Sequence, residues 1–134
     1  MDSANYPGKR ILLIDDNMLT REMMSLILAG EGYRVATACH GADALERLRG
    51  YERPDLILLD LRMPVMDGCT FCDEKKRDPE MASIPLIVLS AAADAAEKAA
   101  AVGAAVCLQK PVDPIRLLDV VRRCCPCRPA PAGA

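Results

Sequence analysis

Short apolar runs alternate with helix-length segments along this chain, and the alternation repeats five times. Three of the runs are continuously aliphatic, which is typical of strands covered on both faces. The expected strands are residues 10–15, 33–38, 55–60, 84–89 and 105–109. A strand followed by a helix, repeated, predicts a parallel sheet with right-handed crossovers and helices on both faces. We therefore expect an α/β domain built on a doubly wound, five-stranded parallel sheet.

The segments between the expected strands carry helix signals. Apolar side chains at helical spacing mark the first, second and last of these helices: Leu19, Met23, Leu26 and Ile27; Leu45 and Leu48; and Leu117, Leu118 and Val121. Asp67 is the expected N-cap of the third helix, around residues 71–72, and the fourth, near 92–102, is almost all alanine. The last helix opens with Asp113-Pro114, a capping residue followed by proline at the first helical position.

Composition narrows the class of protein. A chain of 134 residues suffices for one domain with a real core, expected over residues 9–124, before a disordered proline- and alanine-rich tail at 125–134. Hydrophobic residues make up 51% and aromatic residues only 3%, so the core is aliphatic. A net charge of -2 gives no basis for nucleic-acid binding, and no apolar run approaches the roughly 18 residues of a membrane span. The seven cysteines, without a signal-peptide core before them, favour reduced thiols in the cytoplasm.

Acidic residues close two of the aliphatic runs, with Asp15 and Asp16 after the first and Asp60 at the end of the third. If these strands lie side by side in a parallel sheet, their carboxyl ends bring the three carboxylates into one crevice, where such sheets bind ligands. A divalent cation such as Mg²⁺ would supply the counter-charge, because it prefers hard oxygen ligands. Lys110, at the end of a later strand, adds a cation. The sequence thus predicts a place where a phosphoryl group meets a metal, a lysine and a carboxylate.

Four motifs together resemble the receiver domain of two-component response regulators. They are Ile14-Asp15-Asp16-Asn17, the run from Leu58 to Gly68 around Asp60, Val88-Leu89-Ser90-Ala91, and Leu108-Gln109-Lys110-Pro111. The resemblance spans residues 9 to 124 and implies a flavodoxin-like (βα)5 fold with strand order 2-1-3-4-5. It also implies a regulator that a histidine kinase or a histidine phosphotransfer protein phosphorylates. Such a module would signal by contact with an output protein that the sequence does not name.

The resemblance implies a role for each acidic residue. Asp60 would be the phosphoacceptor, a carboxylate nucleophile that forms an aspartyl phosphate. Asp16 and Asp60 would bind Mg²⁺ directly, together with the backbone carbonyl of Arg62. Asp15 would act mostly through a bound water. The metal would neutralise oxygens of the phosphoryl group during its transfer.

The later motifs supply the remaining parts of the expected site. Lys110 would pair with one phosphoryl oxygen, and Ser90 would hydrogen-bond another and report the phosphate to the surface. Pro111 would follow a cis peptide bond that aims Lys110 into the site. The family usually carries Tyr or Phe three residues before the lysine as a rotating switch, and this chain has Cys107 there. We therefore expect phosphorylation without the usual route of signal output.

Two other classes remain open. The chain could be a receiver cut from a longer hybrid kinase or transcription factor, because its tail is compatible with a severed linker. An aspartyl-phosphate phosphatase would need a second acid to protonate the leaving group, and the residue two past Asp60 is Arg62. We therefore expect no enzyme activity beyond the domain's own phosphorylation and dephosphorylation. The alanine-rich fourth helix offers few charges to fix a dimer interface, so we expect a monomer.

Several other side chains have simpler explanations. His40 is interpreted as a residue of a surface loop. Three C-terminal thiols lack a fourth ligand and so make a poor zinc site: Cys124, Cys125 and Cys127. The methionines of the first helix are interpreted as helix and core filling: Met18, Met23 and Met24.

Overall fold

The computed structural model describes residues 9–50, 53–60, 68–91, 95–101 and 103–124. Its strands are β1 (Arg10–Ile14), β2 (Arg34–Ala38), β3 (Leu56–Asp60), β4 (Leu86–Ser90) and β5 (Val106–Gln109). Its helices are α1 (Met18–Gly30), α2 (Gly41–Gly50), α3 (Gly68–Arg77), α4 (Pro79–Ala82), α5 (Ala95–Ala101) and α6 (Pro114–Cys124). Among the described helices, none has both the length and the apolar character that a membrane crossing requires.

The five strands form one sheet in the order β2-β1-β3-β4-β5, and every neighbouring pair is parallel. This confirms the doubly wound α/β fold and the strand order. The order reverses at β1, which lies between β2 and β3. Because Ile14 is the register partner of Leu59, the residues that follow these two strand positions emerge together at one edge of the sheet. The topology therefore brings the predicted acidic residues to one place.

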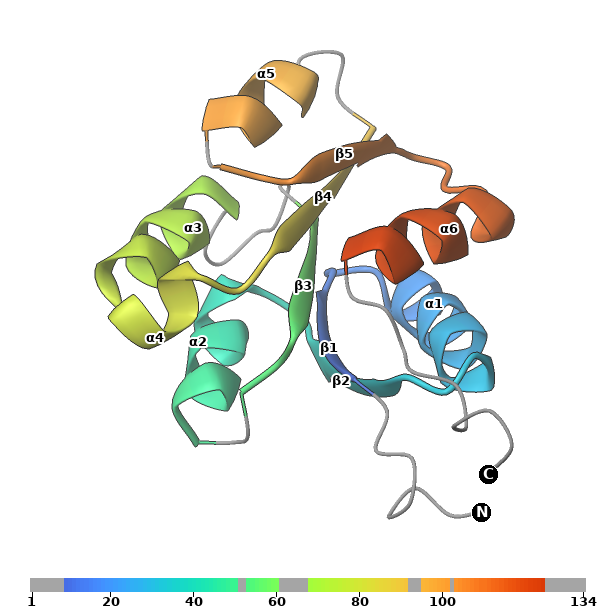
Figure 1. Ribbon diagram of the computed structural model, residues 1–134, viewed down its shortest axis with the longest axis horizontal. Coiled ribbons are helices and arrows are strands. Elements are labelled where there is room, and N and C mark those ends of the chain that lie inside the picture. The colour runs from blue at the N-terminus through green and yellow to red at the C-terminus, as the bar shows by residue number, and fades with distance from the viewer. Residues whose placement is uncertain (1–8, 51–52, 61–67, 92–94, 102, 125–134) are drawn as a thin grey trace.

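Helices cover both faces of the sheet, as Figure 1 shows: α1 and α6 lie on one side, and α2, α3, α4 and α5 lie on the other. Successive strand residues face opposite sides. In β1, Ile11 and Leu13 pack into the core under α1 and α6, whereas Leu12 and Ile14 pack into the core under the other helices. The central strands are thus apolar at nearly every position because neither of their faces meets water.

Most element boundaries agree with the predictions to within two residues, and one helix was missed. The prediction for α6 is confirmed, since the Asp113 carboxylate accepts the Arg116 backbone N–H at 3.3 Å and the helix begins at Pro114. The missed helix is α4, whose N-cap Asp78 accepts the Glu80 backbone N–H at 2.9 Å. The same Asp-Pro signal stands at residues 78–79 and could have identified it. The predicted N-cap Asp67 lies outside the described residues.

The buried face of α1 is not the helical stripe that runs through Leu19, Met23 and Leu26. Met24 and Leu28 are buried against the sheet and α6. Four apolar side chains of this helix are instead 60 to 75% exposed: Met18, Leu19, Met23 and Leu26. The core-filling interpretation is therefore correct for Met24 and wrong for the other two methionines. We refer to these four exposed residues as the apolar surface of α1.

Candidate functional site

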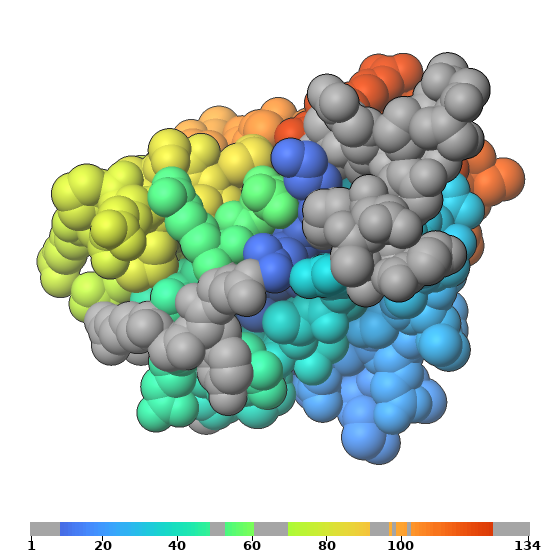
Figure 2. All heavy atoms as spheres, turned by 60° about the horizontal axis from the view of Figure 1, so that its bottom comes forward, coloured from blue at the N-terminus to red at the C-terminus, as the bar shows by residue number. Residues whose placement is uncertain are grey.

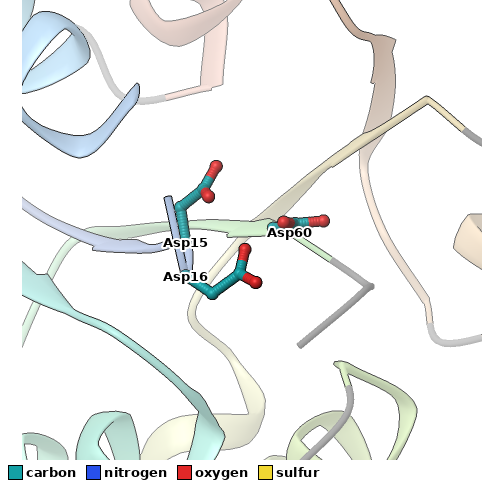
Figure 3. Close-up of side chains that lie close together, drawn as sticks. All are labelled: Asp15, Asp16 and Asp60. Atoms are coloured by element: carbon teal, nitrogen blue, oxygen red, sulfur yellow. The ribbon is translucent and has the colours of Figure 1, made fainter. Parts of the chain in front are cut away.

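Three acidic side chains meet at the carboxyl ends of β1 and β3. One carboxylate oxygen from each of Asp15, Asp16 and Asp60 lies within 4.8 Å of the others. Figure 3 shows the first two at the end of β1 and the third at the end of β3. Asp15 is completely buried and Asp60 is 5% exposed, whereas Asp16 is open to solvent. The three carboxylates predicted from the strand ends do lie together, two of them buried and one exposed.

Lys110 provides a cation to this cluster. Its ammonium donates to Asp15 Oδ2 at 2.9 Å and to Asp60 Oδ2 at 3.3 Å. Burial alone would lower the pKa of Lys110, but the hydrogen bond and charge of Asp15, together with those of Asp60, outweigh it. The pKa therefore lies above its ordinary value of 10.5. The Lys110–Pro111 peptide bond is cis, as predicted.

Ser90 and Cys107 occupy the two strands beyond β3. Ser90 is the last residue of β4 and is 1% exposed, and its carbonyl accepts the Lys110 backbone N–H at 3.0 Å. Cys107, the register partner of Val88, is partly buried and packs against the core on the α2–α5 side. A small side chain therefore fills the position where the resemblance led us to look for a rotating aromatic ring.

Arg21 is a residue of this site that the sequence reasoning missed. Its Nη1 donates to the backbone carbonyl of Asp15 at 2.6 Å. On the other side of the same residue, the Asn17 backbone N–H donates to Asp15 Oδ1 at 2.9 Å. These bonds hold the turn that carries the first two acids. The sequence signal that could have identified Arg21 is a basic residue one turn into the helix that follows the acidic pair.

Arg62, the expected carbonyl ligand, lies outside the described residues, as do Cys125 and Cys127. Burial raises the pKa of the Cys124 thiol, which is partly buried at the end of α6. His40 lies in the turn before α2, where its Nδ1 accepts the Asp43 backbone N–H at 3.1 Å, so this histidine caps a helix. Among the described residues, Asp15, Asp16 and Asp60 form the only cluster of potential metal ligands.

Comparison with known proteins decides the family. Residues 11–122 match the model of the response regulator receiver domain. The chain belongs to the response regulator receiver family. It is 36% identical over 115 residues to the response regulator PleD of Caulobacter vibrioides, an alignment that covers 84% of this chain and 25% of PleD. The receiver domain thus spans about a quarter of that relative.

Solved structures agree in fold. The chemotaxis response regulator CheY4 of Vibrio cholerae has a TM-score of 0.80 at 32% identity, with 87% of this chain and 98% of that chain covered. The receiver domain of the sensor histidine kinase PA1611 from Pseudomonas aeruginosa has a TM-score of 0.79 at 30% identity, covering 87% of this chain and 96% of the other. That structure contains a magnesium ion coordinated in its active site cleft. The chain is accordingly a receiver domain of two-component signalling.

Proposed function

We propose that this receiver domain accepts a phosphoryl group on Asp60 from a phosphohistidine of a partner protein, either a histidine kinase or a histidine phosphotransfer protein. The observation that carries the proposal is the Lys110 ammonium, which lies 2.9 Å from Asp15 and 3.3 Å from Asp60. A cation held against a buried carboxylate is placed to pair with an oxygen of the incoming group. Positioning and charge compensation account for most of the catalysis of phosphoryl transfer.

In the proposed step, a carboxylate oxygen of Asp60 attacks phosphorus in line with the P–N bond of the phosphohistidine. The new O–P bond forms as the P–N bond breaks, its electron pair returns to the imidazole, and the ring takes up a proton from solvent. Lys110 then pairs with one phosphoryl oxygen and the Ser90 hydroxyl donates to another. Ser90 suits this role because it is buried at the end of β4, one residue beyond the register partner of Asp60.

The acidic cluster fits a small, hard cation because all its donors are carboxylate oxygens, and Mg²⁺ is our proposal. Both carboxylate oxygens of Asp15 already accept hydrogen bonds, so this residue would act through a water. Asp16 and Asp60 would be direct ligands, together with the backbone carbonyl of Arg62. Once bound, the ion supplies positive charge opposite the phosphoryl oxygens.

The apolar surface of α1 is the surface we propose for the phosphodonor protein. It begins two residues after Asp16, and monomeric proteins rarely expose contiguous apolar patches without a binding role. A pocket of about 420 Å³, lined by residues that include Met23, Lys110 and Pro111, adjoins this surface beside the acidic cluster. A helical partner whose apolar face covered α1 could present its phosphohistidine to Asp60.

We further propose that the domain works as a monomer in the cytoplasm and catalyses only its own phosphorylation and dephosphorylation. The four cysteines whose side chains the structure describes carry free thiols, which supports a reducing compartment. The module would pass its signal to an output protein by direct contact, either as a separate protein or as part of a longer one.

The test is incubation with acetyl phosphate and Mg²⁺, followed by mapping of the adduct by mass spectrometry. We expect one phosphoryl group on Asp60 and none in Asp60→Asn. The matched control is Asp73→Asn, an exposed acid on α3, which should label like the parent. Full labelling of Asp60→Asn would contradict the proposal.

A further inference from the structure

A second pocket lies at the other end of the sheet from the acidic cluster. It has a volume of about 360 Å³ and is formed by the beginnings of β1 and β2 and the second half of α2. Figure 2 brings this end of the molecule forward and shows atoms of β1 (blue), β2 (cyan) and α2 (teal) side by side. Arg10 begins β1 and Asp15 directly follows its end, so the pocket and the acidic cluster are roughly 16 Å apart along the strand direction.

Three arginines line this pocket. Arg10 and Arg34 are register partners on β1 and β2, so their side chains project from the same face of the sheet. Like charges placed directly opposite one another on neighbouring strands repel. Arg47 reaches the pocket from α2 and adds a third positive charge. A bound anion would relieve this repulsion.

Arg10 and Arg47 both have polar partners, so the charge available to a ligand is that of Arg34. Asp43 lies 3.8 Å from Arg47, and Asp55 accepts the backbone N–H of Arg10 at 2.8 Å. Arg34 is exposed, and within the described part of the chain its guanidinium has no ion pair or hydrogen bond. The described groups around the pocket therefore leave at least one positive charge available to a ligand.

The rest of the lining is apolar. Leu12, Ala36 and Leu48 contribute to it, and Ala36 is small enough to leave space above the sheet. The volume falls within the range of small-molecule sites, which pair apolar walls with a few polar groups. Guanidinium groups bind carboxylate and phosphate in a bidentate manner, and their planar faces stack on flat rings.

We propose that this arginine pocket binds a small organic anion, namely a carboxylate or phosphate attached to a flat ring. Arg34 and Arg10 bind the anionic group, while the ring lies over Ala36 and Leu12 against α2. This site is separate from the phosphoacceptor site, and the proposal does not depend on phosphorylation of Asp60.

The test is a titration of the full chain followed by ¹H–¹⁵N NMR, with three probes used separately: guanosine monophosphate, 1-naphthoate and inorganic phosphate. We expect one or both ring-bearing probes to shift the amides of residues 10–12 and 34–36 without shifting those around Asp60. The identity of the stronger probe tells whether the natural anion is a phosphate or a carboxylate. Inorganic phosphate should bind far more weakly, since it lacks the ring.

Two variants and a matched control complete the test. Arg34→Gln should weaken binding of the stronger probe about tenfold, as expected for loss of one charged hydrogen-bonding group. Ala36→Leu should fill the pocket above the sheet and abolish binding of the probe. Arg123→Gln, an exposed arginine of α6, should bind like the parent. If Ala36→Leu does not fold, Arg34→Gln still tests the proposal, because the Arg34 side chain is exposed. The proposal is overturned if no amide shifts are seen or if the shifts centre on Asp60. It is also overturned if inorganic phosphate shifts the amides equally, or if the shifts survive Arg34→Gln.

Discussion

Replacing Asp16 with asparagine should stabilise the metal-free domain and abolish most of its response to Mg²⁺. The substitution keeps the size and shape of the side chain and removes one negative charge from the acidic cluster. Because Asp16 is exposed, the change disturbs little packing. Stability and metal binding should therefore move in opposite directions in this one variant.

The magnitude follows from the spacing of the charges. At 4.8 Å, two unit charges interact with about 1 kcal/mol in water and about 3.5 kcal/mol at an effective dielectric constant near 20. Asp15 and Asp60 repel Asp16, and the Lys110 ammonium that pairs with both of them offsets part of this repulsion, which leaves roughly one net repulsion. Since its exposure favours the lower value, we expect a gain of about 1–2 kcal/mol, or about 4–8 °C in Tm for a domain of this size.

The assay is thermal unfolding followed by circular dichroism, first with a chelator and then across a series of Mg²⁺ concentrations. For the parent, Mg²⁺ at ten times its Kd should add about 1.4 kcal/mol of stability. Asp16→Asn should begin at a higher Tm and rise much less. Asp73→Asn, outside the cluster, should keep both the parent's Tm and its Mg²⁺ response.

The reasoning is refuted if Asp16→Asn melts below the parent in the presence of chelator. It is equally refuted if the variant and the parent have the same midpoint in the Mg²⁺ series. The first result would mean that the carboxylates do not repel one another, and the second that Asp16 is not a ligand.

Four further outcomes are expected. Lys110→Met leaves two buried carboxylates without their cation and should cost about 3 kcal/mol in metal-free urea unfolding at neutral pH; unchanged stability would contradict the ion pairs. Burial lowers the pKa of Lys75 below 10.5, so Lys75→Met should be more stable than the parent at neutral pH. This gain in stability should vanish as the pH rises above 10.5, and a gain that does not vary with pH would be inconsistent with burial as the cause. Phosphorylation of Asp60 should shift backbone NMR signals at Ser90 and α5 more than at Cys107, and the reverse pattern would restore a switch at that position. Light scattering should find a monomer after phosphorylation, and a stable dimer at low micromolar concentration would show the opposite.

The sequence alone determined the layers of the fold and the clustering of the three acids at the strand ends. The aliphatic runs inside β1, β3 and β4 have polar residues only at the strand ends because both faces of each strand are covered. The meeting of the acids at the ends of two such strands could be predicted in the same way, because a parallel sheet brings the carboxyl ends of its strands to one edge. The pairing of Asp113 with Pro114 marked the start of α6 for a local reason, the unsatisfied N–H groups of a helix end.

Tertiary structure decided what depends on orientation and on contacts between distant residues. Leu19, Met23 and Leu26 follow a helical spacing as well as Met24 and Leu28 do, and only the packing of α1 against the sheet and α6 selects the second set for burial. The periodicity of a helix reports that a stripe exists but not which of two apolar stripes faces inward.

Long-range pairing shaped both sites in the same way. Lys110 meets Asp15 across 95 positions of sequence, and Arg10 meets Arg34 only because β1 and β2 pair in that register. The sequence indicated Lys110 beside the acids through its position at a strand end. The pairing of Arg10 with Arg34 has no such signal, because it arises from the strand order and register. Through the folding of the sheet, charges that are scattered along the chain form an acidic cluster with Lys110 at one end of the strands and an arginine pocket at the other.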